Sequence, residues 1–453
     1  MTHEPNLGRT RPIGGHLRAT VRSLLGARST PEVTVVPEEQ GYVDHVLDLP
    51  ISLELYRELA QLARRVGVTK GFKAVIDTFK VPRGETPAGF RLEFVLAEDA
   101  VARADLVRDI GYDKNGQKRA TEVLFSADSA NPYEVAPIAG MLANLTCNPG
   151  IVYDLFINNP KANLGKKFKT RDEVMLELGQ ILGPGVDISV ELNNPFEQSE
   201  AKILEEASKF REMLTPYRVV IKVPHTGPVN AENVGQLLSG DKRLHRRFDA
   251  GSTSDMLRGH NLALLLREHG FRVNFTLMFE PYQSAMALQA KPYFINSFVR
   301  HRLAQSAAIY ELVEAYRSSR DSQQLVKLRD FLVDKDYLSP DDRNIDLAAV
   351  LEFAERVLRY RKYRPGADGL DAVRHNLRLL RNTNLPDTRL IICSMEGETM
   401  YPDIDLLLGE PEFADMADRL IITAEPGYLA KFTSCNQVVS YQRRFMNAAQ
   451  GQR

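Results

Sequence analysis

A single lysine interrupts the apolar run Arg-Val-Val-Ile-Lys-Val-Pro at residues 218–224. Such a run is typical of a buried β-strand. If Lys222 points into the protein interior, loss of solvation lowers its pKa, and the neutral amine can then attack a carbonyl carbon. The alternative is a structural lysine whose ammonium reaches solvent beyond the end of the strand. Lys222 is therefore a candidate nucleophile for imine chemistry.

Two carboxylates stand late in other apolar runs of the chain. Glu191 interrupts Ile-Ser-Val-Glu-Leu-Asn at residues 188–193, and Asp128 ends the run at residues 121–128. A carboxylate that faces the same interior as the lysine can take up and return protons. A salt bridge to a neighbouring strand is the alternative for Glu191, and a helix cap is the alternative for Asp128.

Amide and hydroxyl side chains complete the set of candidates. In residues 272–279, Asn274 and Thr276 alternate with apolar residues, so we expect them to share one strand face with Met278. Threonine is also an ordinary strand residue, so Thr276 by itself carries little weight. Asn148 precedes a proline and either faces the site or caps the following helix.

These residues require a scaffold that brings several strand ends together. Short apolar runs alternate with helical stretches beyond residue 120, and such alternation indicates a parallel sheet covered on both faces. Eight units in about 320 residues predict an α/β fold, a closed (β/α)8 TIM barrel, whose chemistry lies at the carboxyl ends of the strands. An open doubly wound sheet is the alternative, but no GxGxxG follows the first run. The eight runs are 121–128, 143–148, 187–192, 218–224, 272–279, 292–299, 389–395 and 419–425.

Composition narrows the class of protein. The 453 residues are 43% hydrophobic and 26% charged, which is ordinary globular usage. With 58 Lys and Arg against 59 Asp and Glu, the net charge of −1 argues against nucleic acid as the main partner. Three cysteines without metal-ligand spacing predict neither a disulfide framework nor a zinc site. No apolar run approaches the ~20 residues of a membrane-spanning helix. We therefore expect a cytoplasmic protein without a membrane partner.

The same reading divides the chain into four parts. Residues 1–32 are basic and predict a solvated, disordered arm, with an organelle transit peptide as the alternative. Residues 33–120 predict a small α+β extension, with a helix over 51–68, a strand over 90–96 and a turn at 111–116. Residues 121–440 hold the barrel, and residues 441–453 form a C-terminal tail.

Taken in chain order, these motifs resemble the transaldolase family. The segments that carry the resemblance are FSADS with Asp128, TCNP with Asn148, SVEL with Glu191, VVIKVP with Lys222 followed by Thr226, and VNFTLMFEPYQ with Asn274 and Thr276. They cover about two thirds of the chain, from residue 121 to residue 429.

The resemblance implies a role for each matching residue. Lys222 forms a Schiff base with a ketose, Glu191 and Thr276 hold the water that moves protons, and Asp128 is the acid/base for cleavage of the C3–C4 bond. Asn148 and Asn274 hold the three-carbon fragment. The implied partners are sugars or sugar phosphates, and the chemistry needs no metal and no cofactor, because the iminium itself accepts the electrons.

The segment that resembles the family's SPFVGR is Asn-Ser-Phe-Val-Arg-His-Arg at residues 296–302. Two registers are open: one puts Asn296 at the serine position and His301 at the arginine position, and the other matches Ser297 and Arg302. We keep the polar and basic residues of this segment, together with the serine of the next strand, as candidates for substrate binding: Asn296, Ser297, Arg300, Arg302 and Ser394.

The chain also departs from the family pattern. Glu396 replaces a phosphate-pairing arginine, which predicts repulsion of a phosphate. Two insertions lie at about 227–259 and 303–388. The first contains the basic run 241–247, either an anion site that includes Arg246 and Arg247 or a solvated face. The second is largely helical and is read as a lid or as a surface for self-association into a homo-oligomer.

Three functions follow from this reading. The first is transfer of a three-carbon ketol unit from a ketose or ketose phosphate to an aldehyde, in the pentose phosphate pathway or with an unusual substrate in specialised metabolism. The second is a simple aldolase of the fructose-6-phosphate aldolase type. The third is a catalytically idle barrel used for binding, which the retained lysine and carboxylates disfavour.

Overall fold

The computed structural model describes residues 18–25, 33–79, 82–84, 86–87, 90–97, 99–113, 118–214, 218–395, 397 and 399–452. The chain divides into two compact units. One unit ends at Ala120 and also takes residues 183–186, and the other begins at Thr121. Each unit is described separately below.

The N-terminal unit is built on a four-stranded mixed sheet of order β2-β4-β6-β5. Strands β2, β4 and β6 are parallel, and β5 is antiparallel to β6. A separate antiparallel pair joins β1 to β3. The strands are β1 (Arg18–Thr20), β2 (Thr34–Val35), β3 (Pro50–Ser52), β4 (Arg65–Val68), β5 (Phe90–Leu96) and β6 (Val101–Arg108). The helices are α1 (Val21–Leu25), η1 (Pro37–Glu39), α2 (Gln40–Val43), α3 (Leu53–Leu62) and α4 (Lys70–Phe79).

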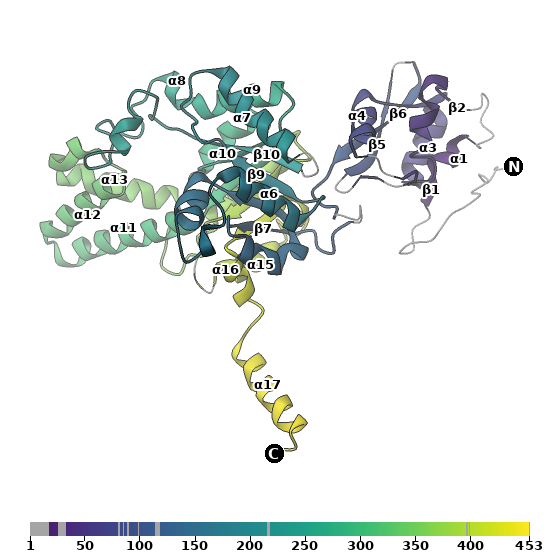
Figure 1. Cartoon of the computed structure of the whole chain (residues 1–453). Coiled ribbons are helices and arrows are strands. Elements are labelled where there is room, and N and C mark those ends of the chain that lie inside the picture. The colour runs from purple at the N-terminus through teal and green to yellow at the C-terminus, as the bar shows by residue number, and fades with distance from the viewer. Residues whose placement is uncertain are drawn as a thin grey trace. The chain divides into compact units, whose positions relative to one another are not determined.

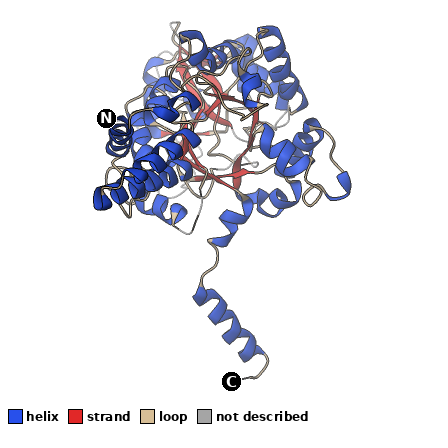
Figure 2. Ribbon diagram, turned by 90° about the vertical axis from the view of Figure 1, so that its left-hand side faces the viewer, coloured by secondary structure: helices blue, strands red, loops and turns tan. Residues whose placement is uncertain are grey.

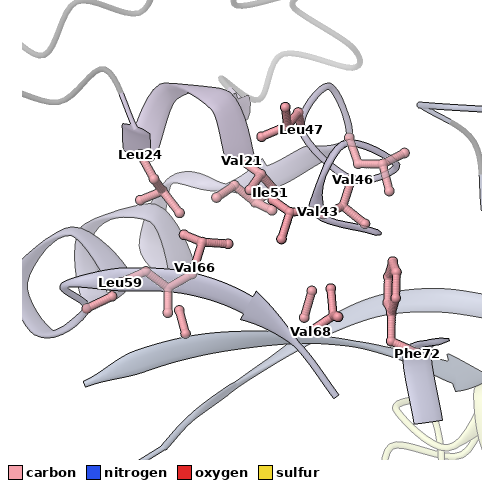
Figure 3. Packing of buried hydrophobic residues seen from close by; sticks show 14 of the residues in the cluster. Val21, Leu24, Val43, Val46, Leu47, Ile51, Leu59, Val66, Val68 and Phe72 are labelled. Carbon is pink, nitrogen blue, oxygen red and sulfur yellow. The ribbon is translucent and has the colours of Figure 1, made fainter. Parts of the chain in front are cut away.

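One hydrophobic core holds this unit together (Figure 3). Val21 and Leu24 from α1 pack in it with Leu59 from α3 and Val66 from β4. Residues 18–25 are therefore ordered by burial of their apolar side chains, which corrects the expectation of a disordered arm for this stretch. The rest of that arm lies outside the described residues.

The helix expected over residues 51–68 is shorter than the sequence pattern suggested. Ser52 caps α3 by accepting a hydrogen bond from the backbone N–H of Leu55, and the helix ends at Leu62. Residues 65–68 form strand β4 instead, because they pair in register with residues 101–104 of β6. Tertiary pairing has overridden the local helical spacing. Strand β5 covers the expected strand, while residues 114–117 of the expected turn lie outside the described residues.

The second unit contains a closed barrel of eight parallel strands in its described residues, which confirms the predicted fold. Figure 2 shows the strands as an inner ring with helices around it. The strands are β7 (Leu124–Asp128), β8 (Leu142–Cys147), β9 (Asp187–Glu191), β10 (Arg218–Pro224), β11 (Val273–Thr276), β12 (Phe294–Phe298), β13 (Arg389–Cys393) and β14 (Leu420–Ala424).

Helical segments connect the strands and cover the outside of the ring (Figures 1 and 2). They are α5 (Pro132–Val135), η2 (Ala136–Met141), η3 (Gly150–Ile157), η4 (Leu164–Lys166), α6 (Arg171–Leu182), α7 (Glu200–Met213), η5 (Val234–Leu237), α8 (Thr253–Met256), α9 (Arg258–Glu268), α10 (Pro281–Leu288), α14 (Asp371–Arg381), α15 (Met400–Leu408), η7 (Ala417–Arg419) and α16 (Pro426–Lys431).

Strand β11 ends earlier than the alternation of residues 272–279 suggested. The strand stops at Thr276, and Leu277 has a φ of 58°, in the left-handed region. Period-two alternation holds only while the backbone is extended. Met278 is therefore not on the polar strand face with Asn274. It is buried, and its sulfur accepts a hydrogen bond from the hydroxyl of Ser284.

A bundle of long helices lies between β12 and β13. It consists of α11 (Arg300–Ser319), α12 (Ser322–Asp334), η6 (Pro340–Asn344) and α13 (Leu347–Tyr360). The three α-helices lie side by side in Figure 1 and share a hydrophobic core that includes Ile309, Leu328 and Val350. The insertion is thus a packed layer with its own buried interior.

The chain ends in α17 (Asn436–Ala449), which has no buried residue and begins before the expected tail at 441–453. No described helix combines the length and the apolar composition that crossing a membrane requires.

Candidate active site

Three neighbouring strands bring their polar side chains together at the carboxyl end of the barrel. Strand register places Lys222 of β10 directly beside Glu191 of β9 on one side and beside Asn274 of β11 on the other. The Lys222 Nζ atom lies 3.3 Å from Glu191 Oε2. The two side chains are only 6% and 13% exposed. The barrel therefore holds a buried ammonium–carboxylate pair.

The pKa of Lys222 differs in direction from the sequence expectation. Burial lowers it, but the carboxylates of Glu191 and Asp128 more than compensate, so the pKa is raised above its ordinary value of 10.5. Sequence reasoning considered only the loss of solvation and could not count the facing carboxylates. In this state Lys222 is an ammonium ion and must give up a proton before it can act as a nucleophile.

Asp128 is a partly buried residue at the end of β7, and its Oδ1 atom is shielded from solvent. Burial raises its pKa from 3.8 to about 6, opposed by the charge of Lys222 and assisted by Glu425 and Glu191. Its Oδ1 atom makes no hydrogen bond to any described residue. A carboxyl with a pKa near neutrality exchanges protons readily under physiological conditions. Asp128 is thus suited to acid/base work beside the lysine.

A chain of side-chain hydrogen bonds crosses the barrel interior. Asn144 Nδ2 donates to Ser126 Oγ over 2.8 Å, and Ser189 Oγ donates to Asn144 Oδ1 over 3.3 Å. Asn274 Nδ2 donates to Ser189 Oγ over 3.1 Å, and Asn296 Nδ2 donates to Asn274 Oδ1 over 2.6 Å. These five buried residues link β7, β8, β9, β11 and β12. The network fixes the positions of Asn274 and Asn296 on the inner face of the barrel.

Several buried hydroxyl groups on the inner face have no hydrogen-bond partner among the described residues. They are those of Thr146, Thr276 and Thr423. Register places Thr146 beside Asp128 and Thr276 beside Pro224, two residues beyond the lysine. Buried polar atoms are nearly always hydrogen-bonded in folded proteins, so such a group of unpaired oxygens marks a place where a polar ligand or water binds.

Other predicted site residues lie elsewhere. Asn148 Oδ1 accepts from the backbone N–H of Ile151, so the side chain caps the segment that follows β8. Ser297 Oγ accepts from Asn376 Nδ2 of α14 over 3.4 Å, which places it on the outer face of β12. Ser394 follows β13 with a φ of 57°, and its carbonyl accepts from the backbone N–H of Arg300 at the start of α11.

Arg302 does not join the group around Lys222. Its guanidinium is 2% exposed and pairs with Glu280 over 2.8 Å and with Asp371 over 2.5 Å. Asn296 occupies the inner face instead, as in the sequence register that matches Asn296 to the family's serine. Glu396, the predicted replacement for a phosphate-pairing arginine, lies outside the described residues.

The basic run at 241–247 already has acidic neighbours. Arg243 pairs with Asp336 over 3.0 Å. Arg246 lies 3.7 Å from Asp255, and Arg247 lies 3.9 Å from Asp342. The side chains of Arg246 and Arg247 remain 42% and 43% exposed. Internal ion pairs thus account for much of the charge in this insertion.

Sequence reasoning missed the residues that make the interior network. Ser126, Asn144 and Ser189 were not singled out, although each stands in an apolar run. The signal was available: Ser126 and Ser189 each precede a predicted site carboxylate by two residues, which is the period of a strand face. Extending each candidate backwards by two positions would have found both serines.

Comparison with known proteins agrees with this geometry. Residues 125–329 match the family model described as transaldolase/fructose-6-phosphate aldolase. The match begins in β7 and ends in α12, so it includes Asp128, Glu191, Lys222 and Asn274 but not β13 or β14. None of the curated proteins matches the chain. The family match supports an aldolase-type function in general. Through residues 125–329 of its barrel, this chain is thus similar to the transaldolase/fructose-6-phosphate aldolase family.

Proposed function

We propose that the protein is a class I aldolase that transfers a three-carbon ketol unit from a ketose to an aldehyde through an imine on Lys222. The observation that carries this proposal is the buried contact of 3.3 Å between Lys222 and Glu191. A lysine in this setting has no structural need for burial, because burying an ion pair gives little net stability. Its presence at the catalytic end of a barrel favours a chemical role.

The first step is activation of the amine. Lys222 passes a proton to Glu191, directly or through a water held by Glu191 and Thr276. The free amine then attacks the ketose carbonyl, and loss of water gives the iminium. The proximity of the two groups and the unpaired hydroxyl of Thr276 support this route.

The second step is cleavage of the C3–C4 bond. Asp128 accepts the proton of the C4 hydroxyl while the electron pair of the breaking bond moves into the iminium and forms an enamine. The aldehyde product leaves, and an acceptor aldehyde takes its place. The reverse sequence then forms the new bond and releases Lys222. A pKa near 6 for Asp128 suits a group that takes and returns one proton in each cycle.

The surroundings of the site support a substrate different from an ordinary sugar phosphate. Arg302 is buried between Glu280 and Asp371, so its charge is already neutralised within the protein. A guanidinium held in this way is not available for bidentate pairing with a phosphate. Arg300, at the start of α11, is the other basic candidate in the same segment.

Borohydride trapping tests the proposal. The protein is incubated with a panel of phosphorylated and unphosphorylated ketoses, reduced, digested and analysed by mass spectrometry. We expect a reduced adduct on the peptide that carries Lys222, and no adduct in the Lys222→Met variant. The Lys169→Ala variant, which alters an exposed lysine, is the matched control and should be labelled like the wild type. Turnover by Lys222→Met would refute the imine mechanism.

Running the reaction with and without an acceptor aldehyde separates transfer from simple aldol cleavage. A transferase releases little free aldehyde until an acceptor is added, whereas a simple aldolase cleaves the ketose without one. Failure of every ketose to label Lys222 would favour the idle barrel.

A further inference from the structure

A cavity lies beside the carboxyl end of the barrel, and none of the residues grouped around Lys222 lines it. It has a volume of about 710 Å³. Its walls come from the segment that follows β11, from the start of α10 and from residues 247–249 of the first insertion. Helices α11 and α13 and residues 335–337, which follow α12, complete the lining. The volume falls within the range of small-molecule sites in proteins.

Aromatic rings line this cavity. Tyr337 and Phe353 form part of the inner wall, and Tyr282, Tyr360 and Phe248 stand around it with 55%, 48% and 44% of their surfaces exposed. The ring centroids of Tyr282 and Tyr360 are 5.9 Å apart. Large aromatic side chains that stay exposed around one hollow have apolar surface that a ligand can cover.

The charges deep in the cavity are already balanced. Glu280 accepts from Arg302 over 2.8 Å and from Arg361 over 2.5 Å, and Arg302 also pairs with Asp371. Arg302 and Arg361 are 2% and 6% exposed. These buried groups shape the floor of the cavity and offer no free charge to a ligand.

Two basic groups on the wall differ from those on the floor. Lys335 and Arg356 line the cavity, and neither has an ion pair with a carboxylate in the described part of the chain. Asp249 and Asp336 also line it, but each already pairs with an arginine of the first insertion. The guanidinium of Arg356 lies 5.2 Å from the centroid of the Phe353 ring. An exposed aromatic wall next to unpaired cations is complementary to a flat apolar group that carries a negative charge.

We propose that this cavity binds a small aromatic acid, whose ring packs against the exposed faces of Tyr282 and Tyr360 and whose carboxylate or phosphate faces Lys335 and Arg356. The cavity adjoins the barrel through Phe279, which lines it and whose ring lies 4.8 Å from that of Phe298 at the end of β12. Binding rests on the cavity's own residues and not on the function proposed for Lys222.

Isothermal titration calorimetry with 2-naphthoate tests the site, and 2-naphthamide serves as the uncharged probe of the same shape. We expect saturable binding of naphthoate. The dissociation constant of naphthamide should be at least about fivefold higher, because it lacks the charge-assisted contact that strengthens binding of naphthoate. Tyr360→Ala should weaken both probes by about tenfold, through loss of ring packing. The double variant Lys335→Gln, Arg356→Gln should bind the two probes equally.

Matched controls keep the test specific. Arg359→Gln alters another exposed arginine of α13 that does not line the cavity, and Tyr133→Ala alters another exposed tyrosine. Both should bind naphthoate like the wild type, and so should Lys222→Met. Three results would overturn the proposal: no saturable heat at millimolar naphthoate, equal binding of the two probes to the wild type, or unchanged binding in Tyr360→Ala. If the wild type binds naphthoate but borohydride traps no ketose on Lys222, only the aldolase proposal is rejected.

Discussion

The ammonium of Lys222 and the carboxylate of Glu191 lie side by side on adjacent strands, 3.3 Å apart and almost fully shielded from solvent. Glu191 therefore controls the protonation of the lysine. Together with Asp128 it holds the pKa of Lys222 above the ordinary value, against the effect of burial.

The Glu191→Gln substitution tests this control. Removing the carboxylate should lower the pKa of Lys222 by about one to three units, the size of shift that an opposite charge within 4–6 Å produces. The measurement is the pH dependence of Lys222 acetylation by acetic anhydride, read by mass spectrometry. Glu177→Gln, which removes the partner of exposed Lys167, should leave the Lys222 profile unchanged. An unaltered midpoint in Glu191→Gln would show that the contact does not set the lysine's protonation.

Replacement of Asp128 by asparagine should separate imine formation from bond cleavage. The variant keeps Lys222 and Glu191, so borohydride should still trap the ketose. The rate of transfer should fall by about 10²–10⁴, the usual contribution of a positioned acid/base group. Asp154→Asn, at an exposed carboxylate after β8, is the control. Full transfer activity in Asp128→Asn would exclude the acid/base role.

The partly buried carboxyl of Asp128 should also make stability depend on pH. Its pKa is raised from 3.8 to about 6. The folded protein therefore binds this proton more tightly than the unfolded chain does. This contribution to the free energy of unfolding is present below pH 4 and is lost as the pH rises from about 4 to about 6, by ~3 kcal/mol at most.

Differential scanning calorimetry of wild type and Asp128→Asn at several pH values measures this effect. Asparagine carries no charge, so the melting temperature of the variant relative to wild type should rise between pH 4 and pH 7. The exposed Asp154→Asn control should show no such trend. If the difference in melting temperature between the variant and the wild type stays constant across this range, folding does not raise the pKa of Asp128.

Glu280 should matter more to stability than a surface carboxylate with similar partners. Glu280→Ala leaves the buried Arg361 without its carboxylate partner. It also removes one of the two carboxylate partners of Arg302. Breaking a buried ion pair from one side costs about 3–5 kcal/mol. The matched exposed pair is Arg378 with Glu412, where Glu412→Ala should cost less than ~1 kcal/mol. Urea unfolding followed by circular dichroism is suitable, since the chain has no tryptophan. Equal losses in the two variants would contradict this account.

The barrel could be predicted because each strand is a nearly continuous apolar run, which requires burial on both faces. The triad of Lys222, Glu191 and Asp128 could be predicted for the same reason, since a charge inside such a run needs an explanation. The raised pKa of Lys222 could not, because it depends on which charges face one another across strands. The inward Asn296 and the buried Arg302 also depend on strand register and helix packing. The local sequence around Asn296 and Arg302 specifies neither the strand register nor the helix packing.

The three-helix insertion packs around buried residues of its own, such as Ile309, Leu328 and Val350. A segment with an independent interior can exchange wall residues without disturbing the eight strands. Under the two proposals made above, evolution can alter the ligand selected beside the insertion while the imine chemistry at Lys222 stays constant. Selection of a ligand and reactivity are then carried largely by separate parts of the sequence.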